Sequence, residues 1–565
     1  MTTLPGRLPA RASRRDWAVL ILKVFIVLAA IALLAVTYVN LEWTSRSPGA
    51  IGDLVGAQRV VDTHQSFYVG ATNQDGPLSL VGYVIAYAIG GQQGAWFVIA
   101  AMVMVVAALI AGAAWITANR ADDRLRDGAA GGTAAIAFFI YLTLGQAEFQ
   151  HMLSGRSVAA LMFVLALPLI LLSAAVADPR RRLLGLALAA ILTGLAVQTA
   201  LSSAATALVF AAFVGWLTLR GRLAQAGTAK WAPVAVFVAV GVTALISVIG
   251  WYALRGDLSD FWIYWWEYAR TSSQAMNDSL GLLGEGISDF AAYYQAQPLQ
   301  PVILVLFGFD TAERVRGRED ASLNFLLFGW WLSGCFAVML SQQFLEESLI
   351  LPAVAIGFMI VLLATRHGRL LAAGHRPAAI ALFLIATLYI AAGTQLSVAI
   401  NRLEGFRSPS ASRQAHRQAL PFLQQVLGNA AAASSKPSTA IYAWTENPAI
   451  YTAADRPAAS RYAVSHWLQG KIPSATTAPK YAIKDGWQNW GADLRLTPPS
   501  LWVEFAETPV PRNLPPLAKV RDCAFELAYK DEFQSVYRRV RPIGPCLDRA
   551  GLKQMDMINA AARER

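Results

Sequence analysis

Long runs of apolar residues, separated by short polar segments, make up most of the chain up to about residue 400. Crossing about 30 Å of hydrocarbon takes roughly 20 helical residues. The runs at 17–39, 94–118 and 377–398 reach that length. The pattern therefore predicts a mainly α-helical protein that crosses a membrane many times.

Eleven membrane spans are expected from this pattern. They lie near 17–39, 94–118, 129–145, 157–177, 183–200, 202–219, 231–251, 298–310, 321–340, 348–365 and 377–398. The apolar stretch over 183–219 is divided at Ser202 and Ser203, and the run at 298–310 is short for a full crossing. Composition agrees with this class, since 56% of the residues are hydrophobic, 15% are charged and the mean hydropathy is +0.43.

The basic residues predict the orientation of these spans. If residues 1–16 are cytoplasmic, most arginines and lysines of the short loops fall on that side, which is the usual positive-inside pattern. They are Arg7, Arg11, Arg14, Arg15, Arg120, Arg124, Arg126, Arg180, Arg181, Arg182, Arg220, Arg222, Lys230, Arg314, Arg316, Arg318, Arg366, Arg369 and Arg376. The net charge of +11 thus indicates topology rather than nucleic-acid binding. The first run is too long for a cleaved signal and is expected to be a retained anchor.

A change in composition after residue 400 predicts a soluble α/β domain over 401–565, outside the cytoplasm. Its expected strands are 439–444, 501–507, 523–529 and 534–540, with a short helix at 447–454. Cys523 and Cys546 both fall in this domain, and its location in an oxidising compartment predicts a disulfide between them. No cysteine or histidine spacing typical of a metal site is present.

The first outer loop, 40–93, combines acids with apolar patterns. Asp53, Arg59, Asp62 and His64 lie within or directly after a helical apolar pattern. Further on, Asp75 stands in an Asn-Gln-Asp-Gly-Pro turn before the apolar stretch 78–89. That stretch is too short to span, so an interfacial or re-entrant helix is expected. The turn chemistry alone can explain Asp75, because an acid favours a helix N-terminus.

Two other outer loops carry candidate chemistry. The loop 252–297 is rich in tryptophan and tyrosine, which suit the membrane–water interface, and it includes Arg270. The loop between the third and fourth spans gathers Glu148, His151 and Arg156. It is either a solvated hairpin or a contact for an acceptor or a phosphate.

The order of these features resembles the C-type membrane glycosyltransferases, the superfamily of protein O-mannosyltransferases, aminoarabinose transferases and mycobacterial arabinosyltransferases. The similarity lies in the first loop, 52-GDLVGAQRVVDTHQSFYVGATNQDGPLSLVGYVIAYAIGG-91, with its early acid and its Gly-Pro-Leu before an apolar helix. The stretch 441-IYAWTENPAIYTAADRPAASRY-462 also resembles the start of their C-terminal domain.

The resemblance implies a site at the outer membrane face. The first-loop acid, the expected general base of these enzymes, falls on Asp53; a helix-capping or surface role is the alternative. Relatives often have an aromatic or His-Tyr pair between the ninth and tenth spans, where this chain has Glu346 and Glu347. The candidate substrate contacts are Asp75, Glu148, His151, Arg156, Arg59, His64, Arg270, Glu346 and Glu347.

The function expected from the resemblance is an inverting transfer of a sugar from a polyprenyl-phosphate donor to a glycan, lipid or protein acceptor. A carboxylate can take the acceptor proton, and cations can hold the donor phosphate. Because the phosphate is itself the leaving group, no metal is obligatory, although a divalent cation is compatible. The expected location is a bacterial inner membrane, with the C-terminal domain outside and no nucleic-acid partner.

Three other functions share some of these features. A transporter usually has ionisable residues within its spans or inverted repeats. The spans here are almost free of charge, with Lys23 as the main exception, and the chain has no internal repeat. A lipid-linked polysaccharide polymerase or ligase shares the topology, but such enzymes favour outer loops rich in arginine. A non-catalytic assembly or sensor protein is the third alternative.

Overall fold

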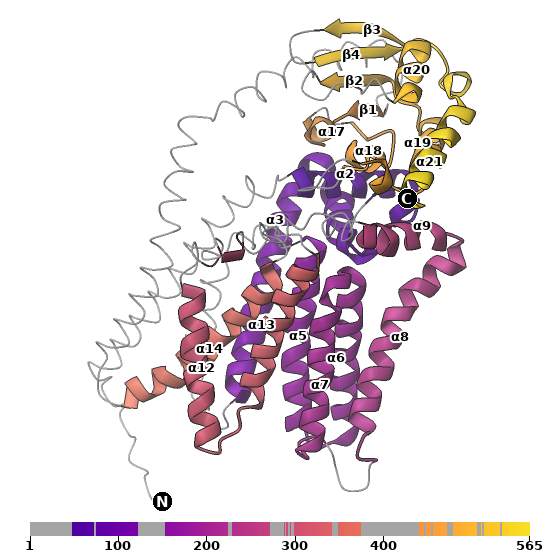
Figure 1. Cartoon of the computed structure of the whole chain (residues 1–565). Helices are drawn as coiled ribbons and strands as arrows, with labels where there is room; N and C mark the ends of the chain where they lie inside the picture. The colour runs from indigo at the N-terminus through magenta and orange to yellow at the C-terminus, as the bar shows by residue number, and fades with distance from the viewer. Residues whose placement is uncertain are drawn as a thin grey trace, which may run out of the picture.

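The architecture of the chain is seen in a computed structural model (Figure 1). It describes residues 48–72, 75–121, 153–223, 229–271, 288, 290–291, 294, 299–341, 349–373, 440–445, 448–453, 456–471, 478–505, 510, 514–530 and 534–564. A bundle of long helices forms one part, and a small sheet with short helices, the C-terminal unit (440–564), lies at one end of it. Helices α2 and α9 lie between the two.

The bundle consists mainly of apolar helices. They are α3 (Val81–Ala121), α5 (Gly155–Ala175), α6 (Pro179–Thr199), α7 (Ala204–Leu219), α8 (Ala232–Arg255), α12 (Leu299–Arg316), α13 (Ser322–Ser341) and α14 (Ile350–Ala373). Within the described residues, six helical stretches are long and apolar enough to cross a membrane: Gly94–Ala118, Gly155–Ala175, Pro179–Thr199, Leu201–Leu219, Ala232–Arg255 and Ser322–Met339. The chain is a multi-pass membrane protein.

These six stretches coincide with six of the predicted spans. The division at Ser202 and Ser203 is confirmed, because a short 3₁₀ helix, η4 (Leu201–Ser203), separates α6 from α7. Helix α12 covers the predicted span 298–310 but carries Asp310, Glu313, Arg314 and Arg316 towards its end, so it is not among the six. The predicted spans 17–39, 129–145 and 377–398 lie outside the described residues.

The short apolar stretch after Asp75 forms a helix of its own, as predicted. It begins with η2 (Pro77–Leu80) and continues into α3 until Gly91, where φ is 61° and ψ is −167°. This left-handed conformation suits glycine and kinks the chain. The apolar helix Pro77–Gly91 is therefore distinct from the candidate span that begins at Gly94.

The C-terminal unit contains a four-stranded sheet of order β1-β2-β4-β3. Its strands are β1 (Ile441–Trp444), β2 (Leu501–Phe505), β3 (Phe525–Lys530) and β4 (Gln534–Arg539). Strand β1 pairs with β2 in parallel, and β4 pairs antiparallel with both β2 and β3. The predicted strands are confirmed with one correction: Cys523 belongs to a helix, α20 (Pro515–Ala524), and β3 starts only at Phe525.

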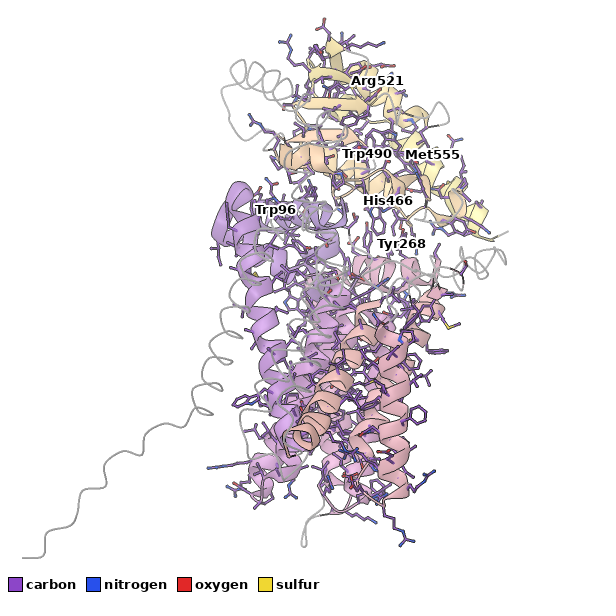
Figure 2. All side chains as sticks on the ribbon, turned by 90° about the vertical axis from the view of Figure 1, so that its left-hand side faces the viewer. Trp96, Tyr268, His466, Trp490, Arg521 and Met555 are labelled. Atoms are coloured by element: carbon purple, nitrogen blue, oxygen red, sulfur yellow. A yellow bond between two sulfur atoms is a disulfide. The ribbon has the colours of Figure 1, made fainter. Side chains whose placement is uncertain are left out.

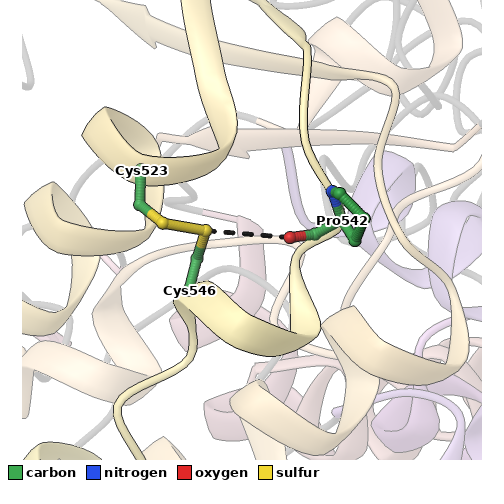
Figure 3. Close-up of a disulfide and its surroundings, with 3 residues drawn as sticks. All are labelled: Cys523, Pro542 and Cys546. Carbon is green, nitrogen blue, oxygen red and sulfur yellow. Dashed lines mark hydrogen bonds between the residues drawn. A yellow bond between two sulfur atoms is a disulfide. The ribbon is translucent and has the colours of Figure 1, made fainter.

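Helices form the connection between the parallel strands β1 and β2, and further helical segments follow the last strand, β4. The connection from β1 to β2 contains α17 (Ala449–Ala453), α18 (His466–Gln469), η7 (Pro479–Tyr481) and α19 (Gly486–Leu496). A 3₁₀ turn, η8 (Gly544–Cys546), and the final helix α21 (Arg549–Glu564) follow the sheet. The disulfide between Cys523 and Cys546 joins α20 to η8, with their Cα atoms 5.7 Å apart (Figure 3).

The two faces of β1 bury side chains in two different apolar clusters. Ile441 and Ala443 belong to a cluster that includes residues of α2 and of the bundle helices. Tyr442 and Trp444 belong to a second cluster, which also contains Tyr68 of the first loop. The hydrophobic core of the C-terminal unit is therefore continuous with that of the first loop.

A short amphipathic helix follows α8 at the end nearest the C-terminal unit. It comprises α9 (Leu258–Trp262) and one π-helical turn, η5 (Ile263–Glu267). Trp262 and Trp266 are exposed and stack with their ring centroids 5.7 Å apart. Tyr268, further along, packs on Trp467 beside His466 of the C-terminal unit (Figure 2). Exposed tryptophan suits a membrane–water interface, which is the position expected for this loop.

Candidate active site

Helix α2 (Pro48–Thr63) carries the first group of candidate residues. Asp53 is half-buried, and its neighbour Gly52 faces Pro448 of the C-terminal unit, whose Cγ would lie 3.6 Å from a Cβ at that glycine. Asp62 is exposed and accepts a 3.3 Å hydrogen bond from the Tyr87 hydroxyl of α3. Partial removal from water raises the pKa of Asp62, and the Tyr87 hydrogen bond partly offsets that rise.

Arg59 lies in the same helix but points into the C-terminal unit. Its side chain is 2% exposed, and Nη1 donates a 3.0 Å hydrogen bond to the carbonyl of Ala458. Nη2 lies 3.5 Å from Oδ1 of Asp493. Burial lowers the pKa of Arg59, while the Asp493 carboxylate raises it. The arginine expected to contact a donor phosphate therefore contacts the C-terminal unit in this structure.

The turn that carries Asp75 packs tightly between α5 and α6. The backbone N–H of Gly76 donates a 2.8 Å hydrogen bond to the carbonyl of Thr199, at the end of α6. A Cβ at Gly76 would lie 1.4 Å from the carbonyl oxygen of Gln198, so only glycine fits there. This contact fixes the residue directly after Asp75 against the bundle.

Asp75 itself lies at the N-terminus of α5. A Cβ built on Gly155, the first residue of α5, would be 2.8 Å from Oδ2 of Asp75. Ser154 caps this helix, and Arg156 follows in its first turn, 8% exposed. The predicted loop position of Arg156 is thus a helical one. The structure thus places an acid of the first loop against the first turn of the helix that carries Arg156.

A helix N-terminus carries partial positive charge because its first N–H groups have no partner within the helix. An acidic residue such as Asp75 is favoured at a position of this kind. Asp75 and Arg156 are therefore candidates to orient polar or anionic groups of a substrate.

Two further candidates, His64 and Arg270, are described by the structure but lie on other segments than Asp75 and Arg156. His64 directly follows α2, with φ of 53°, and is exposed, and Arg270 is exposed beyond η5. Glu148, His151, Glu346 and Glu347 lie outside the described residues. In the part of the chain that the structure describes, no cluster of three or more His, Cys, Asp or Glu side chains could hold a metal ion.

Two charged residues of the C-terminal unit that contact the first loop were not anticipated from the sequence. Asp493 of α19 accepts hydrogen bonds from Arg461, and Arg461 in turn donates to the carbonyl of Tyr68. Arg461 does lie inside the tail stretch 441–462 that carries the family resemblance. Asp493 had no such signal, since an acid in a polar helix usually faces solvent.

Comparisons with known proteins give likenesses among solved structures only. No family model matches the chain, and no curated protein sequence matches it. ArnT from Cupriavidus metallidurans in the apo state is 13% identical, with a TM-score of 0.49 over 94% of this chain and 99% of that one. The same protein bound to undecaprenyl phosphate is 14% identical, with a TM-score of 0.48 and the same coverage.

The Archaeoglobus fulgidus oligosaccharyltransferase, in complex with Zn and sulfate, is also similar in structure. It is 13% identical, with a TM-score of 0.47 over 85% of this chain and 68% of that one. At these identities and scores the likeness concerns the course of the chain alone, and nothing about substrates passes from these proteins to this one.

Proposed function

We propose that the chain is a membrane glycosyltransferase that moves a sugar from a polyprenyl-phosphate donor to an acceptor of the cell envelope, at the outer face of the membrane. The observation that carries the proposal is the position of Asp75 against Gly155, at the N-terminus of α5 and beside Arg156. An acid of the first loop therefore lies against the first turn of the helix that carries Arg156. The resemblance of the first loop to C-type glycosyltransferases supports the same function.

Asp53 is the proposed general base. It is half-buried on α2, in the same segment of chain that returns to the membrane through Asp75 and η2. A half-buried carboxylate can accept the proton of an acceptor hydroxyl that is held beside it. Asp75, which lies against the α5 N-terminus, suits a different role: it accepts hydrogen bonds from hydroxyl groups of the substrates.

The transfer is a single displacement with few components. The acceptor oxygen loses its proton to Asp53 and forms a bond to the anomeric carbon of the sugar. The bond from that carbon to the phosphate oxygen breaks, and the polyprenyl phosphate leaves with the electron pair. Attack from the side opposite the phosphate inverts the anomeric configuration. Arg156 is the proposed contact for the phosphate.

The test is a transfer assay with the purified full chain and radiolabelled polyprenyl-phosphate sugars. Asp53→Asn should insert normally yet lose about 10²–10⁴ in rate, the usual contribution of a positioned base. Asp62→Asn is the matched control, because Asp62 lies on the same helix and is exposed; it should retain wild-type rate. Asp75→Asn should fall between the two.

Each result bears on a separate part of the proposal. Absence of turnover by the wild-type chain with every polyprenyl-phosphate sugar would remove the donor class. Wild-type turnover by Asp53→Asn would instead remove Asp53 as the base and transfer that role to Asp75 or to one of Glu148, Glu346 and Glu347.

A further inference from the structure

The carboxylate of Asp493 accepts hydrogen bonds from several donors of the C-terminal unit. Asp493 is 1% exposed in α19. Arg461 donates through Nε and Nη2, at 3.1 Å to Oδ2 and 3.0 Å to Oδ1. The backbone N–H of Arg461 and the hydroxyl of Ser460 donate to Oδ2 at 2.8 and 3.0 Å. Arg59 reaches the same carboxylate from α2, at 3.5 Å.

From Arg461, the contacts continue into the first loop. Nη1 of Arg461 donates a 3.2 Å hydrogen bond to the carbonyl of Tyr68, and the hydroxyl of Thr72 donates a 3.0 Å hydrogen bond to the carbonyl of Arg461. The Tyr68 hydroxyl then donates to the backbone carbonyl of Asp75, at 2.7 Å. A chain of hydrogen bonds therefore runs from Asp493 through Arg461 and Tyr68 to Asp75.

A second aspartate, Asp260, lies near Arg461, so that the cluster contains two arginines and two aspartates. Oδ1 of Asp260, in α9, lies 3.5 Å from Nη1 of Arg461. Two arginines thus face two aspartates, and the four side chains come from α2, α9 and the C-terminal unit. A 2.9 Å hydrogen bond between the hydroxyls of Tyr264 and Tyr462 also joins η5 to the residue that follows Arg461.

Stability alone does not explain why charged groups occupy this place. Removing ions from water costs about as much as their attraction returns, and apolar residues of similar volume are often equally stable. Directional, charge-assisted hydrogen bonds do specify one relative position of the segments that they join. Here the segments joined are the C-terminal unit and the turn that holds Asp75.

We propose that Asp493 and Arg461 are positioning residues, which fix the Tyr68–Asp75 segment against the N-terminus of α5 and so hold the acids of the first loop in place for sugar transfer. This inference rests on the proposed function. Neither residue touches the substrates. Their effect passes through Arg461 to the Tyr68 carbonyl, and through the Tyr68 hydroxyl to Asp75.

Two variants of the full chain test the two ends of this path. Asp493→Asn weakens the pairing with both arginines, whereas Tyr68→Phe leaves that pairing intact and removes only the hydrogen bond to the Asp75 carbonyl. The control is Glu504→Gln, because Glu504 forms a comparable two-oxygen pair with Arg521, at 2.9 and 3.0 Å. Arg521 lies at the end of the C-terminal unit that is away from the bundle (Figure 2).

The readouts are kcat and KM for transfer, and hydrogen–deuterium exchange of peptides covering 66–80. Small misplacement of reacting groups can cost about 10²-fold in rate. We therefore expect kcat to fall about 10- to 100-fold in both test variants, with little change in donor KM, and exchange over 66–80 to accelerate. Asp493→Glu, which retains the carboxylate, should recover part of kcat. Glu504→Gln should change neither quantity.

Wild-type kcat or wild-type exchange over 66–80 in Tyr68→Phe would overturn the inference, even if Asp493→Asn lowers the thermal stability of the protein. A fall in kcat of equal size in Glu504→Gln would also overturn it, because the effect would then be a general one of the C-terminal unit. If the wild-type chain transfers no sugar, the proposed function fails and the exchange measurement alone decides whether Asp493 orders this loop.

Discussion

The hydroxyl of Tyr68 donates a 2.7 Å hydrogen bond to the backbone carbonyl of Asp75. Burial raises the pKa of Tyr68 well above its usual range, so the phenol keeps its proton and remains a donor. Tyr68 makes this contact from a backbone with φ of 34°, a region that costs a non-glycine residue of order 1–3 kcal/mol. Its ring stacks on Tyr264, with centroids 5.4 Å apart, and packing of this kind offsets the strain.

The first prediction concerns Gly155→Ala. The new Cβ would lie 2.7 Å from Cβ and 2.8 Å from Oδ2 of Asp75, both closer than ordinary contacts. The turn must therefore shift away from the α5 N-terminus, and transfer should fall by about 10²-fold. Gly250→Ala is the matched control, because no atom lies within 4 Å of a Cβ at that helical glycine. The control should keep its transfer rate, and equal rates for the two variants would contradict the placement of Asp75.

A second prediction concerns the disulfide of the C-terminal unit. Cys523 and Cys546 are 23 positions apart, and closing a loop of about this size stabilises a domain by roughly 3 kcal/mol. The double variant Cys523→Ser with Cys546→Ser should therefore unfold at a distinctly lower temperature. Mass spectrometry of non-reduced peptides should find the two cysteines joined in protein from the native membrane. Free thiols at both positions would contradict the pairing.

Features governed by local sequence could be predicted. The strands β1, β2 and β4 follow from short runs of β-branched and aromatic residues, and the helix Pro77–Gly91 follows from an apolar stretch after a Gly-Pro turn. The break between α6 and α7 follows from paired serines. In each case the deciding interactions lie within one or two turns of the residues concerned.

The contacts of the site could not be predicted in the same way. Arg59 and Ala458 are 399 positions apart, and no periodicity along the chain indicates that they meet. In the sequence, Arg59 follows Asp53 in the first outer loop, and that position is as compatible with phosphate binding as with a buried ion pair. The position of Asp75 at the N-terminus of α5 likewise depends on how two separate segments pack, and a turn motif alone does not report this.

A third prediction is a pH dependence that arises from Asp556. This carboxylate of α21 accepts hydrogen bonds from the N–H groups of Trp487 and Gln488 at the start of α19, at 3.1 and 3.0 Å. Burial raises its pKa above the ordinary 3.8, and the two hydrogen bonds only partly offset this. Between 3.8 and the raised value, the folded state binds more protons than the unfolded state. The contribution of Asp556 to stability is therefore largest below that window and is lost as pH rises through it.

The variant Asp556→Asn tests this dependence. It lacks one acceptor, so it should be less stable than the wild type at acidic pH, and the difference should shrink as pH rises because only the wild type loses stability. Thermal unfolding from pH 4 to pH 7 measures the difference. Glu526→Gln, a change at an exposed acid of the same unit, is the control. A difference that stays constant with pH would contradict the prediction.

The last prediction concerns the side of the membrane on which the C-terminal unit lies. The arginine asymmetry of the loops predicts that α6 starts in the cytoplasm and that the C-terminal unit lies outside. Arg181, near the start of α6, has a side chain that is 82% exposed, and Lys484 of the C-terminal unit is also exposed. With Cys335→Ser as the background, Lys484→Cys should react with a membrane-impermeant maleimide in intact cells. Arg181→Cys should react only after the membrane is opened. The reverse pattern would place Asp53 and Asp75 on the cytoplasmic side and remove the outer-face transfer built on them.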